Sequence, residues 1–395
     1  MADLVFSPYD FYDDVDSDPY PVYARLREEA PVYRNEELDF WALSRHEDVV
    51  AAVRDPRRFS SVNGPLLDAS VWGPEARRAL SFIAMDPPHH TRMRGLVSRA
   101  FTPRRVAELE PHIRDVARRH IEAALLKGEV DFVTDIAAKI PTDVISELVG
   151  VPEPDRAELR RLADLALHRE GGGREITPEG LTALIELIGH FTDLVSDRRQ
   201  KTRDDMVSAL LDARVEGDRL TDEEVVAFLH LLVGAGNETT TNLLGNAVYW
   251  AWRYPDQKAL AFEGRVSEWV EETLRYDTAA PTLLRTVSCD VELHGVEIPS
   301  ESRILLLPGA ANRDPAAFPE PDRYDMEREP GPLISFGSGP HFCLGASLAR
   351  LEARVTLEEF IAQATNFDLD MSQAGRRQSP YIRGFAKLPA TVVPR

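Results

Sequence analysis

The chain has 395 residues, of which 43% are hydrophobic and 28% charged, a composition typical of a globular protein with a large core. Its formal net charge of −20 argues against nucleic acid or an anionic membrane as the main partner. Its two cysteines lie far apart and neither belongs to a Cys-x-x-Cys pair, so we expect no disulfide framework and a reducing, cytoplasmic setting. No signal peptide and no membrane-spanning run is visible in the sequence.

The N-terminal part predicts helices and short strands in alternation. A capping box formed by Ser44 and Glu47 should start the helix that follows the second strand. The stretch 60–83 has no clean period and carries apolar residues among glycine and proline, so it is either a mobile surface segment or a wall of a binding cavity. The elements expected here are a helix at 22–29 and strands at 32–34 and 40–43.

Residues 88–105 combine a helical apolar stripe with many histidines and arginines. Most of these arginines would be explained by a solvated helix face. However, so much positive charge in an acidic protein suggests a nearby anion. His90 and Arg94 are four residues apart and therefore share one helix face.

The longest predicted helix is also the most unusual. Thr221 and Glu224 form a second capping box, and an apolar pattern then continues from 225 to 252, well beyond the usual helix length. Its interior contains 234–241, Gly-Ala-Gly-Asn-Glu-Thr-Thr-Thr, which is poor helix material with a carboxylate in an apolar setting. The stretch is either a functional kink or groove, or a packing glycine pair beside a capped glutamate.

The loop 336–345, Phe-Gly-Ser-Gly-Pro-His-Phe-Cys-Leu-Gly, surrounds Cys343 with residues that favour a tight turn. The stretch 346–354 reads as a helix, so the sulfur should lie at a helix N-terminus, where a thiolate is favoured. A thiolate held by backbone donors is a good metal ligand. The alternative is that Cys343 is a small buried hydrophobic residue.

Several motifs, in a consistent order, resemble those of the cytochrome P-450 family. Phe336, Gly339, Cys343 and Gly345 match its haem-binding loop, Phe-x-x-Gly-x-x-x-Cys-x-Gly, and 235–240 resembles its oxygen-activation motif, with Glu where the pattern allows Asp or Glu. The resemblance covers essentially the whole chain. It implies a single domain, 1–395, that is mainly α with a smaller β-rich region: a triangular helical prism around a buried haem.

The resemblance also implies roles for individual residues. Cys343 would be the metal ligand of haem b, and Glu238 with Thr239 would deliver protons to bound oxygen. Glu272 and Arg275, the Glu-x-x-Arg of the family, would form a structural lock with Arg323. The expected haem contacts are His90, Arg94, Ala235, Gly236, Arg285, Phe336, Gly337, His341, Cys343 and Gly345. The expected substrate walls are Leu66, Leu67, Trp72, Phe82, Ile83, Leu165, Leu167, Leu232, Thr282, Leu283 and Ile382.

The implied activity is that of a monooxygenase, which inserts one atom of O2 into a lipophilic small molecule by hydroxylation or epoxidation, in secondary metabolism or in xenobiotic or lipid oxidation. Because no redox module is fused to the chain, electrons should come from NAD(P)H through a ferredoxin reductase and ferredoxin to a monomeric enzyme. The arginines of 92–105, with Arg350 and Arg354, are the candidate docking face for an acidic ferredoxin.

Three alternatives remain. A peroxygenase would use H2O2 directly, and the acid–alcohol pair Glu238/Thr239 argues instead for the O2 route. A non-catalytic haem-binding protein would not need that pair. A cysteine–histidine hydrolase would use Cys343 with His341, but residues two apart beside a helix start do not easily form a nucleophile–base pair, and no orienting group is evident.

Overall fold

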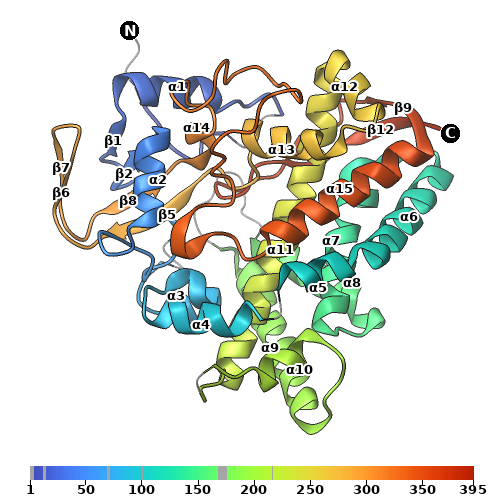
Figure 1. Ribbon diagram of the computed structural model, residues 1–395, viewed down its shortest axis with the longest axis horizontal. Coiled ribbons are helices and arrows are strands. Elements are labelled where there is room, and N and C mark those ends of the chain that lie inside the picture. Colours follow the sequence, from blue (N-terminus) through green and yellow to red (C-terminus); the bar gives the residue numbers. More distant parts are fainter. Residues whose placement is uncertain (1–3, 12–14, 69–71, 100, 168–175, 216) are drawn as a thin grey trace.

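Helices dominate the computed structural model, and a β-rich region lies along one side of them (Figure 1). The structure describes residues 4–11, 15–68, 72–99, 101–167, 176–215 and 217–395, with only the backbone of Pro103 and Leu167. The predicted class, mainly α with a smaller β-rich region, is confirmed. Among the described residues, no helix has the length and apolar character needed to cross a membrane.

The helices are α1 (Tyr20–Glu29), α2 (His46–Arg54), α3 (Ala76–Leu80), α4 (His89–Val97), α5 (Pro103–Glu108), α6 (Glu110–Lys127), α7 (Lys139–Val149), α8 (Glu153–Leu167), α9 (Pro178–Gln200), α10 (Met206–Asp212), α11 (Asp222–Arg253), α12 (Pro255–Phe262), α13 (Val266–Tyr276), α14 (Pro308–Ala311) and α15 (Ala346–Gln363). Three shorter turns of helix are η1 (Ser81–Ala84), η2 (Phe132–Ala137) and η3 (Gly339–His341). The strands are β1 (Val32–Asn35), β2 (Phe40–Leu43), β3 (Phe59–Ser60), β4 (Val130–Asp131), β5 (Leu283–Val287), β6 (Val291–Leu293), β7 (Val296–Ile298), β8 (Arg303–Leu306), β9 (Ala364–Leu369), β10 (Gly375–Arg376), β11 (Phe385–Lys387) and β12 (Pro389–Pro394).

The main sheet joins segments that are far apart in the sequence. Its order is β1-β2-β8-β5-β3, with β2 and β8 parallel and the other neighbours antiparallel. The N-terminal strands in blue therefore lie beside the orange strands β5 and β8 in Figure 1. A second sheet, β4-β12-β9, lies near the far end of α15, and β6-β7 and β10-β11 form two-stranded ribbons.

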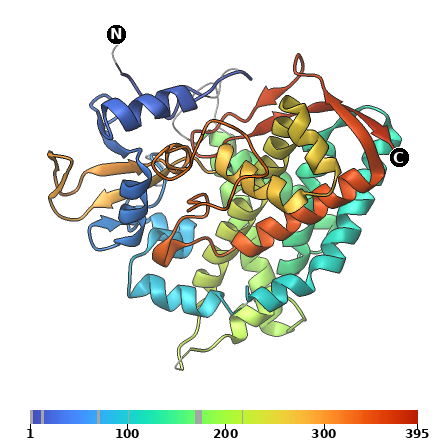
Figure 2. The same ribbon diagram turned by 45° about the horizontal axis from the view of Figure 1, so that its top comes forward.

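Helix α11 runs through the middle of the helical part and crosses behind α15 (Figures 1 and 2). It is 32 residues long, and its start has the predicted capping box, with Thr221 accepting from the Glu224 N–H and Glu224 accepting from the Thr221 N–H. Its neighbours are α7, α9, α13 and α15. The burial of most of its circumference explains the nearly continuous apolar pattern.

The other predicted capping box, Ser44 with Glu47, is wrong. Helix α2 begins at His46, and its N-cap residue, Arg45, makes no side-chain cap. The His46 N–H instead donates to Oδ2 of Asp314 over 2.8 Å. A carboxylate far away in the sequence therefore caps this helix, which a local motif cannot reveal.

A buried carboxylate ties three distant segments together. Asp277 is fully buried and accepts hydrogen bonds from the Tyr20 hydroxyl (2.8 Å), Trp250 Nε1 (3.0 Å) and Arg383 Nε (2.8 Å). Burial acts to raise the pKa of Asp277, but Arg383 and the other nearby cations hold it below its usual value. The stabilisation is therefore complete above the pKa of an unfolded carboxyl group and is lost as the pH falls through the lower folded value.

We predict that Asp277→Asn lowers the free energy of unfolding by about 3 kcal/mol, because it leaves the buried Arg383 without its counter-charge. Asp193→Asn, an exposed change on α9, should have almost no effect. Denaturant unfolding at neutral pH and again near pH 3 measures both. A difference between wild type and Asp277→Asn that does not shrink at the lower pH would contradict this reading.

Candidate active site

A cavity of about 320 Å³ lies between α11 and the loop that precedes α15, and we call it the inner cavity. It brings together most of the residues that the sequence singled out. Those that line it are Phe82, Ile83, Arg94, Leu232, Ala235, Gly236, Thr239, Leu283, Arg285, Phe336, Gly337, His341, Cys343 and Gly345. Residues from five separated parts of the chain thus converge on one space.

The loop around Cys343 depends on two glycines with positive φ, Gly337 (68°) and Gly339 (67°). A Cβ on Gly339 would also lie 3.1 Å from the Arg54 Cα, so any larger residue here would press against the backbone of α2. The Cys343 N–H donates to the Phe336 carbonyl over 2.8 Å, which closes the loop. The turn and the side chain of Cys343 are therefore fixed by the backbone.

The sulfur of Cys343 faces the inner cavity three residues before α15 begins. Burial raises the pKa of the Cys343 thiol, whereas the N–H groups of Gly345 and Ala346 and the charges of Arg94 and Arg350 oppose this rise. The N–H donors expected at the helix start are thus present, but burial raises the pKa of the thiol more than these donors lower it. A bound metal ion would supply the missing positive charge and keep the sulfur deprotonated.

Nitrogen-rich side chains gather on one side of the same cavity. His90 is only 2% exposed, and neither of its ring nitrogens has a partner among the described residues. Its ring centroid lies 4.1 Å from that of His341, and Arg285 is buried nearby. Burial lowers the pKa of His90 to about 4 and that of Arg285 to about 10, because a buried cation loses its hydration, and the charge of Asp86 offsets only part of this cost. Such a cluster suits an anionic ligand.

These observations agree with haem as the ligand. A sulfur ligand faces the cavity, and Arg94, Arg285 and His341 line it, with His90 directly behind. The unpartnered nitrogens of His90 and the charge of Arg285, which Asp86 compensates only in part, match two carboxylate groups. Haem carries both an iron and two propionates, so it would satisfy each of these groups at once.

The opposite wall is the middle of α11. The Thr239 hydroxyl donates to the Ala235 carbonyl over 2.7 Å, one helical turn earlier, and both residues line the inner cavity. A Cβ on Gly236 would lie 3.1 Å from Cδ1 of Ile145, so glycine lets α11 pack closely against α7. Through 234–241 the helix stays α-helical without a break. The unusual composition therefore forms a groove rather than a break in the helix.

Glu238 points away from the inner cavity. It is 4% exposed, with Oε2 2.9 Å from Arg377 Nε, and it is hydrogen-bonded to Asp164 on α8. Burial raises the pKa of Glu238 to about 8, Asp164 acts in the same direction, and Arg377 opposes both. At neutral pH Glu238 therefore holds a proton, and its hydrogen bond to Asp164 connects it to a second carboxyl group. Because Asp164 is exposed, this proton can exchange with solvent.

A second buried acid, Glu352 on α15, was missed from the sequence. It is 1% exposed, lines the inner cavity, and accepts a hydrogen bond from Thr240. Burial raises the pKa of Glu352 to about 8. A signal was present, because Glu352 lies at the core-facing spacing of α15, four residues after Leu348 and four before Thr356.

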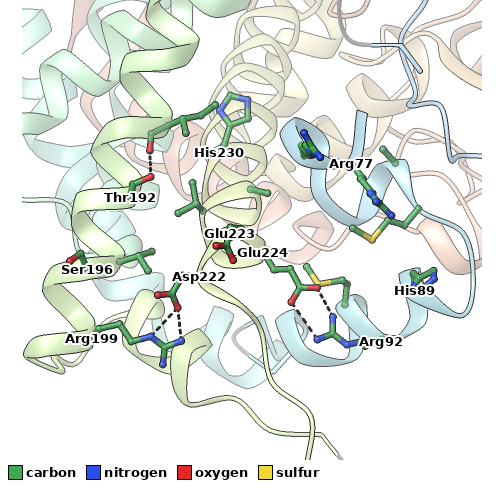
Figure 3. A pocket seen from close by; sticks show the side chains of 18 of the residues that line it. Arg77, His89, Arg92, Thr192, Ser196, Arg199, Asp222, Glu223, Glu224 and His230 are labelled. Carbon is green, nitrogen blue, oxygen red and sulfur yellow. Dashed lines mark hydrogen bonds and ion pairs between the residues drawn. The ribbon is translucent and has the colours of Figure 1, made fainter. Parts of the chain in front are cut away.

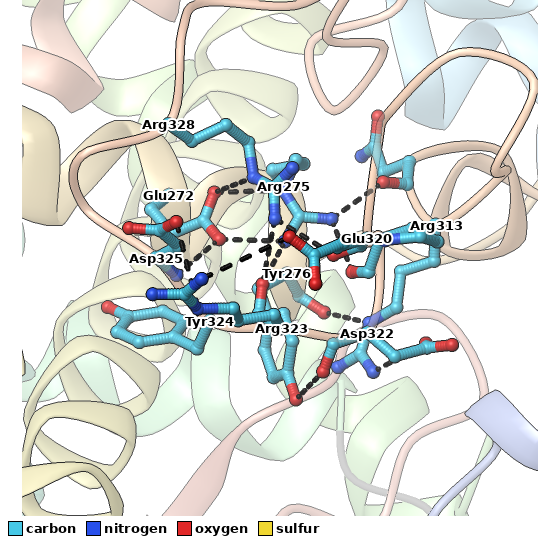
Figure 4. A network of polar contacts seen from close by, with 12 residues as sticks. Glu272, Arg275, Tyr276, Arg313, Glu320, Asp322, Arg323, Tyr324, Asp325 and Arg328 are labelled. Carbon is cyan, nitrogen blue, oxygen red and sulfur yellow. Dashed lines mark hydrogen bonds and ion pairs between the residues drawn. The ribbon is translucent and has the colours of Figure 1, made fainter.

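The predicted lock is present, but its third arginine differs from the expected one (Figure 4). Glu272 accepts two hydrogen bonds from Arg275, at 2.7 and 2.8 Å, and both side chains are buried. The other cation is Arg328, whose Nε lies 3.5 Å from Glu272 Oε2. The side chain of Arg323 is 58% exposed and lies near Asp325, while its backbone carbonyl accepts from Arg275.

Of the eleven expected substrate-wall residues, Phe82, Ile83, Leu232 and Leu283 line the inner cavity. Leu66, Leu67, Trp72, Leu165, Thr282 and Ile382 are not among its described lining residues. Leu67 is buried in the cluster around α1, with Trp72 packed on it, while Leu165 packs on the helical core. Thr282 donates to the Pro380 carbonyl over 3.4 Å. The side chain of Leu167 lies outside the described residues.

Comparison with known proteins identifies the class of protein. The family model described as cytochrome P450 matches residues 182–263 and 266–392, so the chain belongs to the cytochrome P450 family. It is a haem-thiolate P450 monooxygenase, an oxidoreductase.

Individual relatives cover nearly the whole chain. The protein named "Putative cytochrome P450 123" of Mycobacterium tuberculosis is 51% identical over 100% of this chain and 98% of its own length. The vitamin D(3) 25-hydroxylase of Pseudonocardia autotrophica is 38% identical over 95% of this chain and 94% of its own. The solved structure of cytochrome P450 CYP109Q5 from Chondromyces apiculatus has a TM-score of 0.88 at 34% identity, with 96% of each chain covered.

The lock gives a direct comparison between two arginines. Arg328→Gln removes a cation that is 12% exposed from the buried Glu272, so we expect a lower haem content after purification and a loss of about 3 kcal/mol in the free energy of unfolding. Arg323→Gln, in the same loop, should change that free energy by less than about 0.5 kcal/mol. The haem-to-protein absorbance ratio and thermal unfolding measure both variants. An equal effect of the two substitutions would show that Arg323 is the third member after all.

Proposed function

We propose that this P450 inserts one atom of O2 into a lipophilic small molecule, by hydroxylation or epoxidation, in secondary metabolism or in xenobiotic or lipid oxidation. The observation that carries the proposal is the position of Thr239, whose hydroxyl lies at the inner cavity beside the buried acid Glu238. An acid–alcohol pair at this place can deliver protons into the inner cavity, which a simple haem carrier does not need.

The residues that hold the cofactor follow from the cavity. We assign Cys343 as the protein ligand of the haem iron and His90, Arg94, Arg285 and His341 as partners of its propionates. When bound, the thiolate-ligated haem supplies the oxidising chemistry. The chain's own contribution is to fix the sulfur, neutralise the carboxylates and control access of protons.

Protons reach the cavity from the side of α8. Asp164 is exposed to solvent and hydrogen-bonded to Glu238, and Glu238 directly precedes Thr239 on α11. Rotation of the Glu238 side chain away from Arg377 would bring its proton to the Thr239 hydroxyl, which would leave its bond to the Ala235 carbonyl. Arg377 and Asp164 thus act as positioning residues for the acid.

The substrate class follows from the walls opposite the sulfur. Phe82, Phe228, Leu231 and Leu232 are apolar, so binding there depends on burial of apolar surface. Candidates are polyketides, macrolides, terpenoids, steroids and fatty acyl compounds. The name of the vitamin D(3) 25-hydroxylase, which describes oxidation of a lipophilic molecule, supports this class.

Electrons come from NAD(P)H through a ferredoxin reductase and ferredoxin, and the enzyme works as a cytoplasmic monomer. Several arginines of the expected docking face are already paired within the chain: Arg92 with Asp218 and Glu224, Arg350 with Glu271, and Arg354 with Glu110 and Glu358. Arg99 and Arg105 are exposed and have no carboxylate partner among the described residues. We narrow the docking proposal to these two arginines.

We predict that Thr239→Ala lowers the fraction of consumed O2 that appears in product by about tenfold or more, because proton delivery loses its last donor. Thr241→Ala is the matched control, since Thr241 makes the same bond one turn back, to the Asn237 carbonyl, but does not line the inner cavity. Oxygen uptake and product yield measure the coupling. Unchanged coupling in Thr239→Ala would favour the peroxygenase that uses H2O2.

Arg377→Gln should shift the pH dependence of turnover. Arg377 lowers the pKa of Glu238, so its removal raises that pKa further above about 8, and the limb of the pH profile that reports Glu238 moves to higher pH. Arg161→Gln, an exposed change on α8 beside Glu158, is the control. A pH profile that moves to lower pH, or does not move, would show that Arg377 takes no part in proton delivery through Glu238.

A further inference from the structure

A second and larger cavity, of about 1000 Å³, opens at the N-terminal end of α11, and we call it the outer cavity. Its walls come from α9 on one side, α11 in the middle, and α3 and α4 on the other side (Figure 3). Its size lies at the upper end of the range for ligand pockets, roughly 300–1,000 Å³. No role described so far uses it.

The outer cavity lies directly beside the inner one, because three elements present neighbouring residues to both. On α4, Met93 lines the outer cavity and Arg94 the inner one. On η1 and just beyond it, Ala84 and Met85 line the outer cavity, whereas Phe82 and Ile83 line the inner one. Each shared element is therefore a wall between the two spaces.

Helix α11 also presents neighbouring residues to the two cavities, and one of them, Phe228, belongs to the wall between them. Ala227 and His230 line the outer cavity, while Phe228 and Leu231 line the inner one. The rings of Phe228 and Phe82 contact each other with centroids 6.2 Å apart at an interplanar angle of 30°. An aromatic pair, which can move without breaking any hydrogen bond, thus belongs to the wall between the two cavities.

The walls of the outer cavity define what it can bind. Met85, Met93, Ile188 and Val195 give it an apolar body with two adaptable thioether side chains. His230 points into this space and its buried Nδ1 has no hydrogen-bond partner among the described residues (Figure 3). Burial lowers the pKa of His230 to about 4, so the ring is neutral at pH 7 and suits a hydroxyl or carbonyl group.

The charges at the rim do not select an ion. Arg92 is paired with Glu224, and Arg199 with Asp222, as the dashed lines in Figure 3 show. Each pair joins α11 to one of the flanking helices. The charged residues that line the outer cavity are four arginines and four carboxylates, so their formal charges cancel: Arg77, Arg78, Arg92 and Arg199 against Asp86, Asp222, Glu223 and Glu224. The cavity therefore fits an uncharged lipophilic molecule with one polar group, which is the class proposed for the substrate.

We propose that the outer cavity is a reception site, where the lipophilic substrate binds before it passes the Phe82–Phe228 partition into the inner cavity. The proposal rests on the proposed substrate class and extends it. The haem and the reacting part of the substrate would share the inner cavity, whereas the outer cavity offers about 1000 Å³ directly beside it. His230 would hold the polar group of the waiting molecule.

The test uses azoles that ligate ferric haem and shift its Soret band in the holoenzyme. With clotrimazole, a bulky azole, the observed rate should saturate as its concentration rises, because binding in the outer cavity precedes ligation. With imidazole, which is small, the rate should rise linearly. Thr192→Trp fills the outer cavity from α9 and should raise the half-saturating clotrimazole concentration on the order of tenfold.

Thr182→Trp is the matched control, since Thr182 lies on the exposed side of the same helix and makes the same bond one turn back. Thr182→Trp should leave the observed ligation rates of both azoles unchanged. A linear clotrimazole rate in the wild type, or an unchanged half-saturation in Thr192→Trp, would overturn the reception site. Because azole ligation needs neither O2 nor electrons, these outcomes are independent of whether the proposed oxidation is correct.

Discussion

The position of the sulfur depends on a buried ion pair on α13, far from the Cys343 loop in the sequence. Arg275 pairs with Glu272 and donates to the Asn312 carbonyl. The Asn312 side chain in turn bonds Ser335 and the Ile334 N–H, immediately before Phe336, whose carbonyl accepts from Cys343. Hydrogen bonds, together with the peptide link from Ser335 to Phe336, therefore connect α13 to the backbone of Cys343. A buried pair of this kind adds little net stability, but it determines where an irregular loop lies.

Buried charge is sorted by type around the inner cavity. The basic side chains His90 and Arg285 lie on one side, and burial lowers the pKa of each. The acids Glu238 and Glu352 belong to α11 and α15, and burial raises the pKa of each. Burial thus favours the neutral forms of these side chains, so fewer of them are charged than their residue types suggest. The basic side gains its counter-charges only with a bound anion, whereas the acidic side can hold protons for later release.

The sequence predicted the parts of this site that depend on local spacing. Cys343 and Thr239 lie in motifs whose glycines are required by the local backbone geometry and packing, and both residues line the inner cavity. It did not distinguish Arg323 from Arg328, because an irregular loop has no period that tells which side chain turns inward. Glu352 was missed because an acid in an amphipathic helix is usually on the solvent side, and only the packing of α15 against α11 shows otherwise. The helices and most strands were predictable, whereas caps and walls made by distant segments were not.

The sheet β4-β12-β9 has a consequence for the synthesis of the protein on the ribosome. Val130 of β4 pairs with Ala390 of β12, which the ribosome makes much later. At the usual pace of translation, this interval lasts roughly ten seconds or more. During that time the backbone N–H and C=O groups of β4 are not yet paired with β12, and an unpaired strand can pair with strands of other chains. Nascent copies are therefore exposed to aggregation throughout this interval, when a chaperone would be of most use.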